Sequence, residues 1–185
     1  AQARRVAARL ESDLHERLEL TRGLSAFVRS NWDFTAEDFM SFAGALQGDL
    51  SGIRSLQLAP NAVVKYLTNL EANRAALGHD LRADPDRRVQ VTAAINERRY
   101  IIAGPFDLIQ GGSAIVARLP VYRPVTGTAA ESFWGFATVL LDPTQLISGS
   151  GLRQGTEHLE FALRGKDGLG AEGDLISGSD QVFQD

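Results

Sequence analysis

The segment IIAGPFDLIQGGSAIVARLPVYR, residues 101–123, carries the clearest structural signal in the chain. Aliphatic and β-branched side chains dominate both of its ends, and Gly111-Gly112 separates them. Two apolar runs around a glycine pair are typical of antiparallel strands joined by a tight turn. The same pattern predicts strands at about 53–58, 100–103, 106–109, 114–122, 132–141 and 157–164, with short ones at 174–177 and 181–183.

Helical patterns precede most of these strands. Apolar residues recur every three or four positions over 2–30, which predicts a helix about 43 Å long at ~1.5 Å per residue. We expect part of it to stand clear of the core, although it could also pack along its own domain. Thr35 and Asp38 fit a capping box for a helix over 36–47. Further helices are predicted at 62–76, from Asp84-Pro85-Asp86 onward, and at 142–149. Helices followed by an antiparallel sheet indicate an α+β domain.

Composition excludes several classes of function. The chain has 185 residues, a net charge of −4 and no cysteine. A mildly acidic protein is a poor match for nucleic acid, and without cysteine there are no disulfides, thiolate nucleophiles or zinc–cysteine sites. The sequence has no long apolar run and no signal-peptide pattern, and it begins at Ala1. Because the first residue is alanine rather than methionine, we expect a fragment of a longer protein.

No catalytic or metal-binding motif emerges. Candidate serine nucleophiles lack a G-x-S-x-G context, and the three histidines are too dispersed for a helical metal site: His15, His79 and His158. Asp84 and Asp86 are best explained by helix capping. We expect no enzymatic activity, no cofactor and no bound metal in this chain.

Six short motifs follow one another along the chain in an order that is typical of one family. They are Gly52–Gln57, Gly78–Leu81, Gly104–Phe106, Leu108–Gly112, Leu119–Tyr122 and Trp134–Ala137. Together they resemble the CHASE family over residues 20–148. Members of that family are extracytoplasmic sensory domains of bacterial histidine kinases, diguanylate cyclases and phosphodiesterases, and of plant cytokinin receptors.

The resemblance implies an architecture and a cellular context. Residues 1–32 would form a stalk helix, 33–148 a membrane-distal PAS-like subdomain that binds ligand, and 149–185 a small or truncated membrane-proximal PAS-like part. The domain would lie in the periplasm, tethered to the inner membrane and dimerised through its first helix, with a histidine kinase or cyclic-di-GMP enzyme as output. The alternatives are a periplasmic solute-binding or scaffolding module without a signalling role, or an unrecognised hydrolase.

The resemblance also implies a ligand site. In cytokinin-binding relatives an aspartate accepts hydrogen bonds from the ligand, and its position corresponds to Asp80, beside Leu81. Ala103 and Ile109 fall on other pocket positions. Arg118 replaces a small polar residue, which is a departure from the family pattern. A guanidinium favours a carboxylate or phosphate over a neutral purine, so we expect a small organic anion as ligand.

Strand alternation does not decide whether these side chains line a pocket. Arg118 and Tyr122 share one face of their strand, and that face is either a pocket lining or solvent-exposed. Trp134 belongs either to the core or to the pocket wall. Asp80 could instead cap its loop. If that face lines a pocket, the ligand would be surrounded by five side chains: Asp80, Ile109, Arg118, Tyr122 and Trp134.

Overall fold

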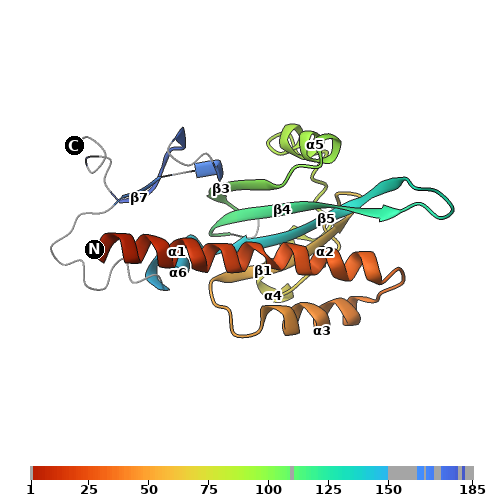
Figure 1. The fold of residues 1–185 in the computed structure, drawn as a ribbon, viewed down its shortest axis with the longest axis horizontal. Coiled ribbons are helices and arrows are strands. Elements are labelled where there is room, and N and C mark those ends of the chain that lie inside the picture. The colour runs from red at the N-terminus through yellow and green to blue at the C-terminus, as the bar shows by residue number, and fades with distance from the viewer. Residues whose placement is uncertain are drawn as a thin grey trace.

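The computed structural model describes residues 2–108, 111–149, 162–164, 166–168, 172–178 and 181. At its centre lies a five-stranded antiparallel sheet in the order β2-β1-β5-β4-β3. The strands are β1 (Ile53–Pro60), β2 (Tyr66–Leu67), β3 (Ile101–Asp107), β4 (Ser113–Pro124) and β5 (Glu131–Leu141). Helices precede and cover this sheet (Figure 1). The predicted α+β fold, with an N-terminal helix and a PAS-like antiparallel sheet, is confirmed.

The glycine turn predicted between β3 and β4 is present. Asp107 pairs with Ser113, the amide of Leu108 donates to the carbonyl of Gly112 at 2.9 Å, and Gly112 has a positive φ of 75°. The two strands predicted over 100–109 form one strand, because a shift of register between Ala103 and Phe106 absorbs the interruption.

One face of the sheet is covered by α1 (Gln2–Leu18), α2 (Leu20–Ser30) and α3 (Ala36–Gln47). The predicted long helix is thus two segments, with a turn at Glu19. Buried side chains of α2 pack against β4 and β5, including Leu24 and Val28. Helix α3 has its predicted bounds, and Thr35 and Asp38 form the predicted capping box.

Arg17 of α1 lies outside the apolar positions that recur every three or four residues over 2–30. Spacing places this residue on the polar face, but it is buried, with only 8% of its surface exposed. Its Nε donates to the carbonyl of Ser51 at 2.8 Å and its Nη1 to that of Asp13 at 2.7 Å. Backbone acceptors allow a charged side chain to be buried where spacing alone predicts exposure.

The other face of the sheet is covered by α4 (Leu70–Asn73), the 3₁₀ turn η1 (Arg74–Ala76) and α5 (Arg88–Glu97). The helix predicted over 62–76 is wrong for 62–69. After Pro60 the backbone turns through left-handed conformations at Asn61 and Ala62, and a short strand then pairs with β1. Helix α5 begins later than predicted, since residues 84–87 form a turn.

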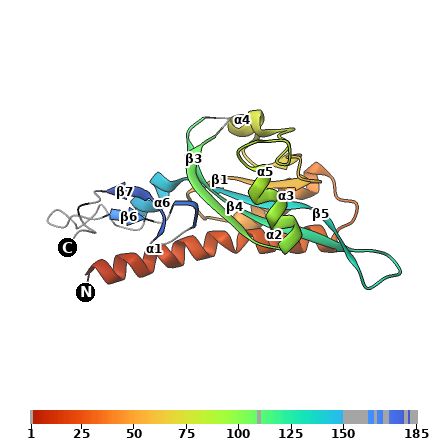
Figure 2. The ribbon, with the colours of Figure 1, turned by 90° about the horizontal axis from the view of Figure 1, so that it is seen from above.

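The C-terminal part includes α6 (Pro143–Gly149), predicted as 142–149, and a separate pair of strands, β6 (Ala162–Arg164) and β7 (Leu175–Gly178), linked through η2 (Lys166–Gly168). The strands predicted over 157–164 and 174–177 overlap β6 and β7, although 157–161 lie outside the described residues. Of the strand predicted over 181–183, only residue 181 is described. The small sheet lies at the same end of the molecule as the start of α1 (Figures 1 and 2). Among described helices, none combines the length and apolarity needed to cross a bilayer.

Candidate functional site

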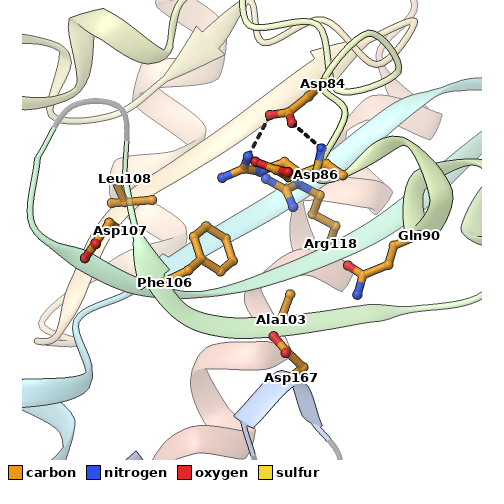
Figure 3. A pocket seen from close by; sticks show the side chains of 10 residues that line it. Asp84, Asp86, Gln90, Ala103, Phe106, Asp107, Leu108, Arg118 and Asp167 are labelled. Carbon is orange, nitrogen blue, oxygen red and sulfur yellow. Dashed lines mark hydrogen bonds and ion pairs between the residues drawn. The ribbon is translucent and has the colours of Figure 1, made fainter.

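A cavity of about 580 Å³ opens between β3, β4 and the turn that leads into α5. Its apolar wall consists of Ala103, Phe106 and Leu108 (Figure 3). Gln90 and six charged residues complete the lining: Asp84, Asp86, Arg87, Asp107, Arg118 and Asp167. A concave site of this size suits a small molecule, and because seven of its ten lining residues are polar or charged, it suits a polar or charged one.

Arg118 forms the base of this cavity. It lies on β4 between Ile101 of β3 and Thr138 of β5, and only 7% of its surface is exposed. Its buried Nε has no hydrogen-bond partner in the described part of the chain. Burial, reinforced by the charge of Arg87 and opposed by that of Asp84, lowers the pKa of Arg118 to about 9. The guanidinium therefore remains cationic at neutral pH.

Gln57 provides a second unpaired donor. Its side chain lines an inner cavity of about 20 Å³, and that cavity shares Arg87, Phe106, Leu108 and Arg118 with the larger one. Gln57 is 4% exposed, and its buried Nε2 also lacks a partner among the described residues. The inner space can hold about one water molecule. Gln57 and Arg118 therefore each offer a buried donor to an acceptor that the described residues do not supply.

Asp84 organises the opposite wall. Its Oδ2 lies 2.6 Å from Nη1 of Arg87 and 2.7 Å from Nε2 of His79. Burial acts to raise the pKa of Asp84, but bonds from the Asp86 amide, His79 and Arg87 outweigh it and lower the pKa. Arg87 also lies over the Phe106 ring, with 4.9 Å from guanidinium carbon to ring centre. The charge of Arg87 is therefore matched, whereas that of Arg118 has no ion-pair partner among the described residues.

Only part of the predicted ligand set lines the cavity. Ala103 and Arg118 do, and Ile109 lies outside the described residues. Asp80 is exposed, and its Oδ1 accepts from the amides of Arg82 and Ala83, which is the loop-capping alternative.

The remaining three residues of the predicted ligand set make other contacts and do not line the cavity. Leu81 is 1% exposed and belongs to the apolar cluster beneath α5. Tyr122 shares the face of Arg118 as predicted, but its hydroxyl donates to the Ile95 carbonyl and it does not line the cavity. Trp134 packs on the opposite face, against Phe34, with ring centres 6.2 Å apart.

Sequence reasoning missed Gln57 and Arg87 and treated Asp84 only as a cap. Asp84 does accept from the Asp86 amide, at 2.9 Å, but it also holds Arg87 at the cavity. Phe106 belongs to one of the family motifs, and this was an available signal that its segment faces a ligand site. Among the residues described, no cluster of three or more acidic or histidine side chains is arranged to hold a metal ion.

Comparisons with known proteins identify the family and the fold. The family model for the CHASE domain matches residues 59–176. No curated protein shows significant sequence similarity to the chain.

Two solved structures share the fold. One is an extracellular ligand-binding receptor from Desulfohalobium retbaense, with a TM-score of 0.60 and 10% identity over 79% of this chain. The chain spans only 26% of that receptor. The other is the ligand-binding domain of the Pseudomonas aeruginosa amino-acid chemoreceptor PctC in complex with GABA, with a TM-score of 0.60 and 16% identity. That match covers 96% of this chain and 74% of the PctC domain.

Proposed function

Since the chain belongs to the CHASE domain family, we propose that it is the extracellular ligand-sensing domain of a transmembrane receptor, and that an anionic group of its ligand binds Arg118. One observation carries the ligand proposal: the cationic side chain of Arg118 is 7% exposed, forms the base of a cavity of about 580 Å³, and has a buried Nε without a hydrogen-bond partner among the described residues. Burying a cation without an anion is costly, and a bound carboxylate or phosphate removes that cost.

For signalling, ligand binding must change the conformation of a part of the domain outside the cavity. Asp167 of η2 lines the cavity, and its Oδ1 accepts from the Gly104 amide of β3 at 2.6 Å. The turn η2, which lies between the two C-terminal strands, therefore contacts the central sheet at the cavity itself. A ligand that binds one arrangement of this contact more tightly shifts the population toward it.

The receptor context is part of the same proposal. We place the domain in the periplasm, tethered to the inner membrane, with a cytoplasmic histidine kinase or cyclic-di-GMP enzyme as output and with dimerisation through α1. Val6 and Leu10 of α1 are only half-buried in the single chain, which leaves apolar surface for a second copy. The parent gene should then encode apolar spans of about 20 residues on both sides of this domain. Their absence would favour a soluble solute-binding module.

Dimerisation is tested by cysteine crosslinking of the full-length receptor in membranes. A cysteine at Leu10 should form a disulfide between two copies, whereas one at Glu71, on the exposed surface of α4, should not. Equal crosslinking at both positions, or none at Leu10, would contradict pairing through α1.

The ligand proposal is tested by a thermal-shift screen of carboxylic acids and amino acids, including 4-aminobutanoate, on residues 1–185. A ligand at 100 times its dissociation constant adds about 2.7 kcal/mol of stability, which is about 5–10 °C for a domain of this size. We expect at least one compound to raise the midpoint of the wild type and to leave Arg118→Met unchanged. Equal shifts in both proteins, or no shift with any acid, would refute the assignment.

A further inference from the structure

The charges that line the cavity are segregated. Arg87 is paired with Asp84 at 2.6 Å, which leaves Arg118 as the unmatched cation of the described lining, at its base. Asp86, Asp107 and Asp167 are exposed, and none of them forms an ion pair with another described residue. In Figure 3, Asp107 lies beyond Phe106 and Asp167 lies below Ala103, whereas Asp86 overlaps the Arg118 side chain in this view. The cavity thus combines a buried positive base with a negative rim.

This segregation constrains the ligand more than Arg118 does alone. A simple anion would bind the guanidinium, but it would lie among three unneutralised carboxylates that repel it. A simple cation would neutralise the rim, but it would leave the buried guanidinium of Arg118 unpaired. A molecule with both charges satisfies both regions at once.

We propose that the ligand is a small zwitterion, with its carboxylate or other oxyanion on Arg118 and its ammonium group toward the rim carboxylates. The inference rests on the proposed function, and it adds recognition of the ligand's ammonium group by the rim carboxylates. The rim alone would be only a group of surface acids. Within the same cavity, Arg118 is 7% exposed and its Nε has no partner in the described part of the chain, which makes the rim one side of a charge-matched site.

Asp86 and Asp167 occupy different positions at this rim. Asp86 belongs to the turn before α5, so its carboxylate is carried by the wall that also holds Arg87. Asp167 already accepts one hydrogen bond, from the Gly104 amide. An ammonium group has three donors and can bridge carboxylates on separate elements. Such a contact would connect η2 to the ligand directly.

Isothermal titration calorimetry of residues 1–185 tests the proposal with matched compounds. The probes are the twenty L-amino acids, their des-amino acids and the corresponding amines without a carboxylate. For the best amino acid, we expect at least tenfold tighter binding than for either analogue. If the des-amino acid binds equally well and still requires Arg118, the zwitterion inference fails and the anion proposal stands. If no compound binds, or if Arg118→Met has no effect on binding, both fail.

Rim variants provide the second arm. The triple variant Asp86→Asn, Asp107→Asn and Asp167→Asn should reduce the preference for the amino acid over its des-amino analogue at least fivefold. Asp49→Asn, an exposed change outside the cavity lining, is the matched control and should leave this preference unchanged. Circular dichroism establishes that each variant is folded. A folded triple variant with an unaltered preference would overturn the role of the rim.

Discussion

Gln57 on β1 and Arg118 on β4 both pair with Thr138 of the intervening strand β5, so their side chains leave the same face of the sheet. Each ends in a buried nitrogen that lacks a hydrogen-bond partner among the described residues. Unsatisfied buried donors cost stability in the empty domain. Apolar substitutions at these two positions should therefore stabilise the empty domain and weaken ligand binding.

Replacing Gln57 with leucine should raise the free energy of unfolding of the empty domain by on the order of 1 kcal/mol, because it removes an unpaired buried amide of similar size. Ser55→Ala on the same strand is the matched control. Ser55 donates to the Thr68 carbonyl at 2.9 Å, so its loss should cost about 1 kcal/mol. Urea unfolding measures both. A large loss of stability in Gln57→Leu would mean that the amide is satisfied.

Arg118→Met should likewise stabilise the empty domain, by about 1–3 kcal/mol at pH 7, since an apolar side chain replaces a buried cation. The pKa of Arg118 is about 9 in the folded protein, against 12.5 as its ordinary value. Between these values the unfolded chain binds more protons, so the contribution of Arg118 to stability rises with pH. The gap between variant and wild type should be constant below pH 8 and narrow above pH 9. Destabilisation by Arg118→Met at all pH values would indicate a structural role.

Asp84→Asn should destabilise the domain by about 2 kcal/mol at pH 7, because it weakens charged hydrogen bonds to Arg87 and His79. The pKa of Asp84 is lowered in the folded state. Its contribution is therefore present above the ordinary aspartate pKa and is lost as the pH falls through the folded value. Unfolding at pH 7 and pH 2.5 should show the difference shrinking in acid. Asp86→Asn, the exposed control, should change stability little at either pH.

Gly135→Ala should cost at least about 2 kcal/mol, since a Cβ at this position would overlap the carbonyl oxygen of Ala59, a backbone atom of the neighbouring strand. At Gly44 in α3 nothing lies within 4 Å of the place that a Cβ would take, so Gly44→Ala should stabilise the helix by about 0.5–1 kcal/mol. Thermal melts compare the two. Equal effects would mean that β1 and β5 can separate without cost.

Local patterns in the sequence predict the elements whose signals are complete within a few residues. The capping box of Thr35 and Asp38 marks the start of α3, and Gly111-Gly112 marks the β3–β4 turn. The helix predicted over 62–76 is wrong for 62–69, although the apolar spacing of that part suits a helix. There the left-handed turn at Asn61 and the pairing of β2 with β1 override that preference.

The candidate site is predicted less completely. Arg118 stands out because its charge departs from the family pattern. Gln57 does not, since its proximity to Arg118 depends on a strand register between segments about 60 residues apart. The ion pair of Asp84 and Arg87 is local in sequence, but its place on the cavity wall depends on how the turn before α5 packs over β3.

The Nε–H group of Arg118 reports directly on contact between this side chain and the ligand. Its ¹⁵N–¹H signal, assigned by its loss in Arg118→Met, can be followed during titration with the best amino acid from the calorimetric series. We expect a downfield proton shift and slower exchange with water, because a ligand oxygen accepts from a nitrogen that has no partner among the described residues of the empty domain. Saturation of binding with this signal unmoved would contradict the placement of the ligand on Arg118.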